Sequence, residues 1–330
     1  MKKIIVFMCI LLCIFAFVGC KEDDGLIPVS VNEVTHSVFY APQYAAINLG
    51  FFEQEGLKLD FATGEGADKV MAAVLSGSVD IGFSGPEAAI YVYNEGRENH
   101  PMLFAQLTRR DGAFLVGRTP EPDFDFADLK GKHVLPGRRG GVPFMTFEYI
   151  LKNHGLDPDT DLNFDDSIQF SMLAGAFTGG TADYVALFEP TASMLEKEGK
   201  GYIVASIGKE GGNIPYTAYY ASKSFINDHP DVIQKFTNAI YRAQKWVMDS
   251  SDEEVAKAIQ PSFPDTDLDI LTSVVARYRS IGAWCDTPVM DEDGFMRLQD
   301  IIITSGELQE KVPLSAVADN SFALQAVSSR

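Results

Sequence analysis

The sequence predicts an α/β fold with two lobes, each a mostly parallel sheet flanked by helices, and a cleft between them. Short apolar strands alternate with amphipathic helices from residue 31 onward, which is typical of parallel sheets covered on both faces. Pro-, Asp- and Gly-rich stretches at 119–126 and 211–222 interrupt this alternation twice. The chain of 330 residues is also long enough to bury more than one core. We therefore expect the chain to cross from one lobe to the other and to return.

These features divide the chain into five segments. They are a signal peptide at 1–19, a tether at 20–30, the first part of lobe 1 at 31–118, lobe 2 at 119–214, and a return to lobe 1 with C-terminal helices at 215–330.

In lobe 1 the pattern predicts three strands, each followed by a helix. The expected order is strand 31–40, helix 41–56, strand 57–64, helix 67–78, strand 79–85, helix 86–96 and extended chain at 101–118. In the helix at 67–78, Val70, Ala73 and Val74 recur at helical spacing, and Gly77 is typical of a helix end.

Lobe 2 and the return are expected to begin with a strand and to become strongly helical. The expected elements are strand 130–137, helix 142–155, strand 183–190 and, within the strongly helical stretch that begins with 226–250, a long helix that starts at Pro230 or Asp231. The apolar face predicted for the long helix consists of Val232, Phe236, Ala239, Ile240 and Ala243.

A short internal similarity links the two lobes. Residues 75–88 and 177–192 share the order of a helix end, glycine, aspartate, apolar strand, proline and small-residue helix. If the two segments are equivalent, 84–87 and 188–190 follow corresponding strands and face each other across the cleft. Ligands of open α/β sheets bind at this carboxyl edge.

The N-terminus has the form of a bacterial lipoprotein signal. Lys2 and Lys3 precede an apolar run that is too short for a comfortable membrane span, and "FVGC" at 17–20 resembles the lipobox, in which the cysteine is lipidated. We expect an exported protein anchored to the membrane by lipid on Cys20, with an uncleaved N-terminal anchor as the alternative.

Charge and cysteine usage exclude several classes of function. A net charge of −19 makes the chain a poor partner for nucleic acid. Once Cys20 carries lipid, Cys285 is the single cysteine left in the mature domain, so we expect neither disulfides nor a thiolate metal cluster. The five histidines lack metal-ligand spacing. No metal and no cofactor are predicted.

The segment "DIGFSGPEAA" at 80–89 comes within one residue of the pattern that exposes a nucleophilic serine. A nucleophile elbow needs glycine two residues after the serine, where this chain has Pro86. Ser84 and Glu87 instead match the capping box S-x-x-E, whose helix start also offers N–H groups to a ligand. A hydrolase that uses Ser84 is the alternative from another functional class.

Two further groups of residues suggest ligand contacts. The turn "GRRGGVPFMT" at 137–146 can bring backbone N–H groups to a polar ligand, although it matches no nucleotide-binding motif and also reads as an ordinary turn with solvated arginines. Aromatic residues near turns could form a stacking clamp for a flat ligand, or belong to the core. They are Phe39, Tyr40, Tyr44, Phe144, Phe188, Tyr216, Tyr219 and Tyr220.

The chain resembles a known family. The segments that carry the resemblance are "YAAINLGFFEQEGL" at 44–57, "ADLKGKHV" at 127–134 and "SKSFINDHPDVIQKFTNAIYRAQKWV" at 222–247. With the signal peptide, they resemble the substrate-binding lipoproteins of bacterial ABC importers. The chain is most similar to the branch that binds sulfonates, nitrate, taurine and the pyrimidine precursor of thiamine. The resemblance covers about residues 31–300.

The resemblance implies a type II periplasmic-binding-protein fold that closes by a hinge around a small molecule. It implies a non-enzymatic, monomeric protein outside the cytoplasm that delivers its ligand to an importer permease, with a membrane sensor as a weaker alternative. The fungal enzyme relatives use a cysteine-rich, iron-binding segment, which this chain lacks. The implied ligand-binding residues are Tyr40, Pro42, Tyr44, Ser84, Gly85, Glu87, Arg138, Gly140, Gly141, Phe144, Glu189 and Tyr216.

The charged residues of this set point to different ligands. Glu87 and Glu189 would repel a sulfonate and suit an amino-bearing heterocycle, whereas Arg138 and Arg139 suit an anion. The preferred ligand is a pyrimidine like the thiamine precursor, and the alternative is a sulfonate-, nitrate- or taurine-type anion.

Overall fold

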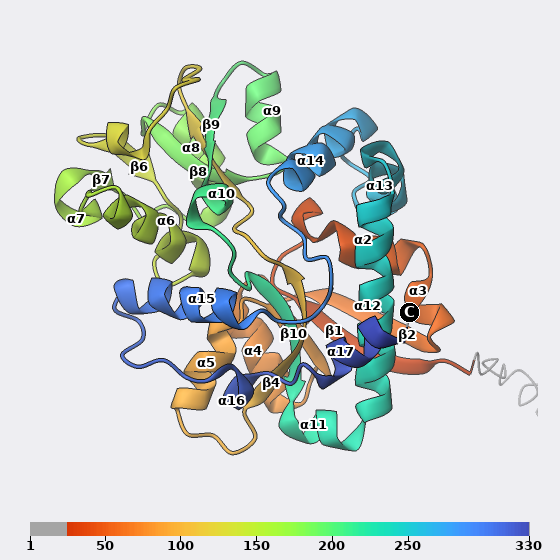
Figure 1. Cartoon of the computed structure of the whole chain (residues 1–330). Coiled ribbons are helices and arrows are strands. Elements are labelled where there is room, and N and C mark those ends of the chain that lie inside the picture. Colours follow the sequence, from red (N-terminus) through yellow and green to blue (C-terminus); the bar gives the residue numbers. More distant parts are fainter. Residues whose placement is uncertain (1–24, 330) are drawn as a thin grey trace, which may run out of the picture.

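Two five-stranded mixed sheets organise the computed structural model, which describes residues 25–329 (Figure 1). The first sheet has the order β2-β1-β3-β10-β4, with strands β1 Ile27–Glu33, β2 Leu57–Thr63, β3 Ile81–Ser84, β4 Pro101–Thr108 and β10 Thr217–Ser222. The second has the order β7-β6-β8-β5-β9, with strands β5 Ala113–Gly117, β6 His133–Leu135, β7 Asn163–Phe164, β8 Tyr184–Phe188 and β9 Tyr202–Ser206. The predicted α/β architecture in two lobes is confirmed.

The two sheets have the same strand plan. β10 runs antiparallel to both of its neighbours in the first sheet, as β5 does in the second, and the remaining pairs are parallel. β3 and β8 therefore occupy the same central position. Each leads through a proline into a helix, α5 (Glu87–Asn94) or α9 (Thr191–Lys197). This equivalence confirms the internal similarity predicted from the sequence.

The first crossing lies earlier than expected. β5 pairs with β8 and β9, so it belongs to the second lobe, and the chain crosses at 109–112 instead of after residue 118. The expected boundary is wrong because the Pro- and Asp-rich stretch is a surface loop that leads into η3 (Phe126–Leu129). The second crossing, at 212–216, runs beside the first: Ile214 N–H donates to Arg109 O at 3.0 Å, and Tyr216 N–H to Thr108 O at 3.1 Å.

Two expected elements near the N-terminus also differ. β1 begins at Ile27, so 27–30 belong to the sheet and not to the tether, because Ile27, Val29 and Val31 continue the inward alternation. The strand ends at Glu33 and is followed by η2 (Val38–Tyr40). The helix expected at 41–56 is split at Gly50, whose φ of 71° ends one helical segment before the next begins. The two helices are α2 (Ala41–Asn48) and α3 (Phe51–Gln54).

The remaining helices cover the two sheets. They are α4 Ala67–Ser76, α6 Val142–Asn153, α7 Pro158–Asp161, η4 Phe170–Met172, α8 Leu173–Thr178, α10 Ile207–Gly211, α11 Lys223–Asp228, α12 Pro230–Asp249, α13 Asp252–Ile259, η5 Gln260–Ser262, α14 Leu268–Ser280, α15 Glu292–Thr304, α16 Leu314–Val317 and α17 Ser321–Ser328. The apolar face predicted for α12 is buried at every named position. No helix within 25–329 has both the length and the hydropathy to cross a bilayer.

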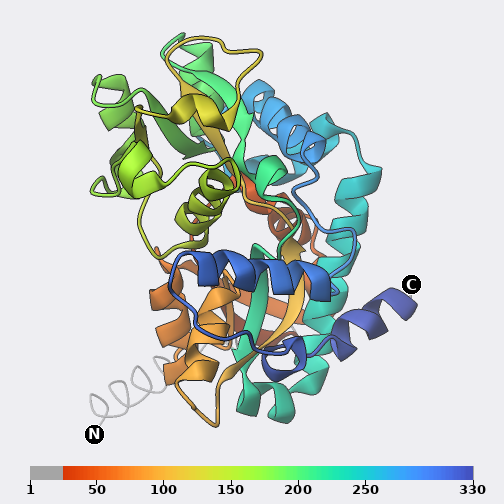
Figure 2. The ribbon, with the colours of Figure 1, turned by 60° about the vertical axis from the view of Figure 1, so that its left-hand side comes forward.

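The C-terminal helices, expected with lobe 1, touch both lobes. α14 packs against α13 and also against α9 of the second lobe. α15 packs against α6 of the second lobe and α5 of the first, and Figure 2 shows it in blue across their junction. The signal peptide and Cys20 lie outside the described residues.

Candidate functional site

Ser84 is the last residue of β3, and its hydroxyl is buried. It hydrogen-bonds to the Tyr220 hydroxyl at 2.8 Å, on the neighbouring strand β10. Pro86 is the N-cap of α5, and no described side chain caps that helix. The predicted capping box is therefore wrong, because a strand partner 136 residues away takes up the serine hydroxyl.

Glu87 is the first residue of α5, and one of its carboxylate oxygens makes no hydrogen bond to that helix. The residue is 6% exposed, and within 25–329 its Oε2 has no hydrogen-bond partner. The carboxyl group folds back over Gly85, where any added Cβ would overlap Oε2. Burial raises the pKa of Glu87 to about 7, opposed by a hydrogen bond from its own backbone N–H. Glu87 is thus a buried acceptor at the carboxyl edge of β3.

Asp111, in the first crossing, is a second buried acceptor that sequence reasoning missed. It is 1% exposed; Oδ1 accepts from Ala113 N–H at 2.7 Å, whereas Oδ2 has no partner among the described residues. Burial raises the pKa of Asp111 to about 7, and the backbone of Ala113 and the hydroxyl of Tyr216 oppose this shift. The sequence signal for this site is an aspartate followed by glycine where the chain crosses between lobes. It was missed because the crossing was expected after residue 118.

Aromatic rings from both lobes pack beside Gly112, the residue after Asp111. The Phe39 ring, in lobe 1, lies 5.9 Å from Phe188 at the end of β8, 5.6 Å from Tyr216 and 5.0 Å from Tyr278 of α14, between ring centroids. Glu87 and Asp111 both raise the pKa of Tyr40 and of Tyr216, so both carboxyl groups lie within electrostatic reach of these two hydroxyls. We call this set the interlobe cluster: Phe39, Tyr40, Glu87, Asp111, Phe188, Tyr216 and Tyr278.

Glu189, expected as a ligand acceptor, already has partners for both carboxylate oxygens. Its carboxylate accepts from the N–H and the hydroxyl of Ser193, each at 2.8 Å, and forms an ion pair with Arg277 Nε at 3.3 Å. Its backbone N–H donates to the Tyr278 hydroxyl at 3.1 Å. Burial raises the pKa of Glu189, while Ser193 and Arg277 oppose the shift. These contacts join α9 of the second lobe to α14.

Other expected residues lie in the first lobe near Glu33. Pro42 lies in the first turn of α2 and is buried. The Tyr44 hydroxyl donates to Glu33 Oε2 at 2.6 Å, and Gln43 and Thr63 donate to the same carboxylate. Tyr44 is therefore held by an internal network and is not part of the interlobe cluster.

The expected residues of the second lobe form the turn between β6 and α6. Gly140 has a φ of 82°, which favours glycine, and Gly141 is the N-cap of α6. Arg138 is exposed. Arg139 pairs with Asp166 at 2.6 Å, and its guanidinium lies over the buried Phe144 ring. Neither arginine belongs to the interlobe cluster.

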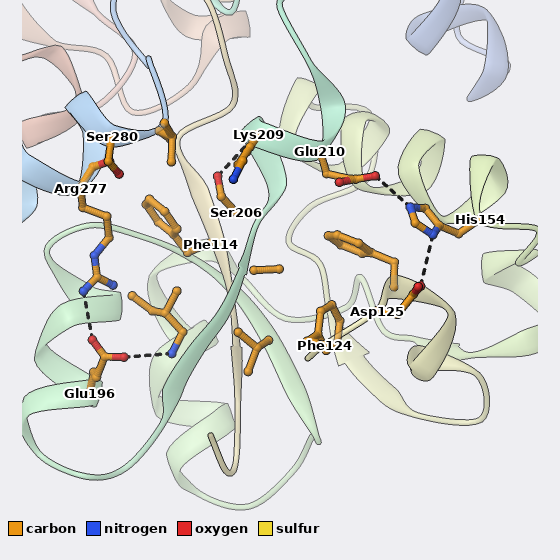
Figure 3. A pocket seen from close by; sticks show the side chains of 15 residues that line it. Phe114, Phe124, Asp125, His154, Glu196, Ser206, Lys209, Glu210, Arg277 and Ser280 are labelled. Carbon is orange, nitrogen blue, oxygen red and sulfur yellow. Dashed lines mark hydrogen bonds and ion pairs between the residues drawn. The ribbon is translucent and has the colours of Figure 1, made fainter. Parts of the chain in front are cut away.

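A cavity of about 640 Å³ lies elsewhere, along edge strand β9 (Figure 3). α10 and the end of α14 also line it, and its polar wall includes the Arg277–Glu196 and His154–Glu210 pairs. None of the residues predicted to bind ligand lines this cavity. In the described part of the chain, no three His, Cys, Asp or Glu side chains gather as a metal site.

Residues 38–254 match the family model described as "NMT1/THI5 like". The chain belongs to the NMT1/THI5-like family. A relative from Bacillus subtilis (strain 168), named "Putative binding protein YtlA", is 42% identical over 316 residues, covering 96% of this chain and 95% of the relative. The 4-amino-5-hydroxymethyl-2-methylpyrimidine phosphate synthase of Aspergillus parasiticus is 25% identical over 221 residues, covering 64% of this chain and 63% of the enzyme.

Solved structures confirm the fold of this NMT1/THI5-like protein. The alkanesulfonate-binding protein SsuA from Xanthomonas axonopodis pv. citri, solved with bound MOPS, superimposes with a TM-score of 0.70 at 14% identity. The superposition covers 89% of this chain and 98% of SsuA. The two-lobe periplasmic-binding-protein fold predicted by resemblance is therefore correct.

Proposed function

We propose that this protein is the extracytoplasmic solute-binding component of an ABC importer. Its ligand binds at the interlobe cluster, and the protein passes it to a permease. One observation carries the proposal: Glu87 Oε2 is buried without a hydrogen-bond partner among the described residues, and its carboxyl group acts electrostatically on Tyr40 of the first lobe and Tyr216 of the second crossing. A buried acceptor without a hydrogen bond costs roughly 1–3 kcal/mol, which a ligand donor would recover. A ligand held by both lobes favours the closed arrangement, because that arrangement alone contacts it from both sides.

The ligand that fits this cluster best is a flat heterocycle with amino substituents, such as the thiamine precursor 4-amino-5-hydroxymethyl-2-methylpyrimidine. Its ring can stack on the aromatic side chains, and its amino group can donate to a buried carboxylate. The relative from Aspergillus parasiticus is named for the phosphate of this same pyrimidine, which supports the choice.

A sulfonate-type anion is the second candidate, because Arg138 is exposed beside the start of α6, and no described side chain caps that helix. An anion could bind there. At the interlobe cluster, however, Glu87 and Asp111 would repel it. The similarity to SsuA supports the fold and does not bear on the choice of ligand.

We also propose that the protein acts without turnover, as a monomer held at the membrane by lipid on Cys20. The Ser84 hydroxyl bonds to Tyr220, which cannot serve as the base of a catalytic triad at neutral pH because burial raises its pKa. A sensor that contacts a membrane receptor would use the same ligand site, and neighbouring transporter genes would favour the importer.

The test is isothermal titration calorimetry of the purified protein with three ligands. We expect saturable heat with 4-amino-5-hydroxymethyl-2-methylpyrimidine and none with taurine or an alkanesulfonate. Binding of an anion with no response to the pyrimidine would reverse the ligand assignment. Absence of binding by any small molecule, including those found by native mass spectrometry of the purified protein, would overturn the function itself.

A further inference from the structure

Asp111 lies where the two crossings and both lobes meet. The backbone of Gly208, from α10, packs so closely against it that an added Cβ would overlap the Asp111 carbonyl group. The next residue, Gly112, accepts a hydrogen bond from the Tyr278 hydroxyl at 3.3 Å. Asp111 is therefore held in place by the second lobe on one side and by α14 on the other.

This packing fixes the Asp111 carboxylate and leaves its Oδ2 without a hydrogen bond to any residue of 25–329. Oδ1 is tied to Ala113 N–H, and the residue is 1% exposed, so Oδ2 cannot turn to solvent for a partner. Oδ2 nonetheless lacks a hydrogen bond within the described residues. Glu87 Oε2 is in the same state, and both groups act on Tyr40 and Tyr216. The cluster thus contains two buried carboxylate oxygens, Glu87 Oε2 and Asp111 Oδ2, without a hydrogen-bond partner among the described residues, while the Tyr216 hydroxyl also faces Asp111 as a donor.

The cationic groups near Asp111 have other partners. Arg109 pairs with Asp286 at 2.9 Å, and Arg110 donates to Asn213 Oδ1 at 2.9 Å. Arg277 pairs with Glu189 and Glu196. The groups that act electrostatically on Asp111 are the hydroxyls of Tyr40, Tyr216 and Tyr278.

We propose that Asp111 is a second ligand-binding carboxylate, which with Glu87 selects ligands that carry two separate hydrogen-bond donor groups. This inference rests on the proposed function and adds a residue and a selection rule to it. Each donor satisfies one buried acceptor, so a ligand with a single donor leaves the other carboxyl group desolvated and unpaired. A ligand without donors, or one with a negative charge, satisfies neither.

The pyrimidine 4-amino-5-hydroxymethyl-2-methylpyrimidine meets this rule with its amino and hydroxymethyl groups. Two analogues each remove one donor: 5-hydroxymethyl-2-methylpyrimidine lacks the amino group, and 4-amino-2,5-dimethylpyrimidine lacks the hydroxyl. Charged hydrogen bonds of this kind are worth roughly tenfold or more in affinity. We expect each analogue to bind wild-type protein at least roughly tenfold more weakly than the parent.

The experiment combines these analogues with Asp111→Asn and Glu87→Gln in calorimetric titrations. Each variant should bind the parent roughly tenfold more weakly. One analogue should bind Asp111→Asn as well as it binds wild type, and the other should bind Glu87→Gln as well as it binds wild type. In each of these combinations the analogue lacks the donor and the variant lacks the acceptor of the same hydrogen bond, so the second change costs nothing further. Glu95→Gln is the control, since Glu95 is an exposed acid at the end of α5, and it should bind the parent like wild type.

Wild-type affinity of Asp111→Asn for the parent would overturn the inference while leaving the proposed function intact. Equal affinity of wild-type protein for the parent and both analogues would also overturn it, and that result does not require the variant to fold. Failure of wild-type protein to bind any of the three pyrimidines would instead contradict the ligand assigned under the proposed function.

Discussion

The ring of Phe39 in the first lobe lies 5.9 Å from the ring of Phe188 in the second, between centroids. Gly112 of the first crossing lies between them, because an added Cβ there would stand 2.7 Å from Phe39 Cδ2 and 2.9 Å from Phe188 Cε1. The two lobes therefore meet through aromatic rings packed on a glycine, and the contact depends on the absence of a side chain at residue 112.

Gly112→Ala should hold the lobes apart. The added methyl group would require both rings to move, so the closed arrangement would lose the Phe39–Phe188 contact. We expect roughly tenfold weaker binding of the pyrimidine and a larger radius of gyration in the presence of ligand, measured by small-angle X-ray scattering. Gly175→Ala is the control, because a Cβ there meets nothing within 4 Å. Identical scattering of Gly112→Ala and wild type would contradict this role.

Glu87→Gln should change the pH dependence of stability. The pKa of Glu87 is raised in the folded protein, from 4.5 to about 7, so the folded state holds its proton more tightly than the unfolded state does. Its contribution to stability is complete below pH 4.5 and is lost as the pH rises through 7. Each unit by which the pKa in the folded state exceeds that in the unfolded state corresponds to about 1.4 kcal/mol in the free energy of unfolding.

Without ligand, the glutamine variant should therefore unfold at a higher temperature than wild type at pH 8, and the difference should shrink toward pH 5. Differential scanning fluorimetry across this range measures it. Glu95→Gln, at the exposed end of α5, should follow the wild-type profile. A constant difference at every pH would show that the carboxyl group does not titrate in this window.

Arg277→Gln should destabilise the docking of α14 on the second lobe. Its guanidinium pairs with Glu189, whose side chain is fully buried, and with Glu196. Breaking a buried pair costs about 3–5 kcal/mol, and the partial exposure of Arg277 places the expected loss below that, at about 2 kcal/mol.

Adding Glu189→Gln to Arg277→Gln should recover part of this loss, because no uncompensated carboxylate then remains buried. Arg97→Gln, which removes a pair exposed on both sides, should cost less than about 1 kcal/mol. Urea unfolding followed by circular dichroism gives all three values. Equal losses for the Arg277 and Arg97 variants would show that the buried pair has no special role.

Cys20→Ser should release the protein from the membrane. The N-terminal sequence predicts lipidation at this cysteine, and two acyl chains anchor a protein stably. We expect the wild-type protein in the membrane pellet and the variant in the soluble fraction after cell fractionation. Retention of the variant in the pellet would favour the uncleaved anchor.

The sequence predicted the elements and the fold more reliably than the connections between them. Strands such as β3 and helices such as α12 follow from periodicity, which is local. The lobe to which β5 belongs does not, because an apolar strand pairs equally well with either sheet until its neighbours β8 and β9 are in place. The boundary expected after residue 118 was wrong for this reason.

In the candidate site, too, local sequence pattern predicted some features and tertiary contacts decided others. The position of Glu87 at a strand end placed it at the carboxyl edge from sequence alone. The tertiary structure decided that the Ser84 hydroxyl bonds to Tyr220, 136 residues away, and that no side chain caps α5 among the described residues.

By itself, the sequence determined the family, the two lobes and the edge at which a ligand is expected, because these follow from local pattern and motif. The tertiary structure decided which carboxyl groups lack partners. Asp111 becomes a buried acceptor when Gly208 and Tyr216 pack around the crossing, and the Glu189 carboxylate is taken up by Ser193 and Arg277. Burial and hydrogen-bond partners come from residues distant in the chain, so sequence pattern alone could not assign them.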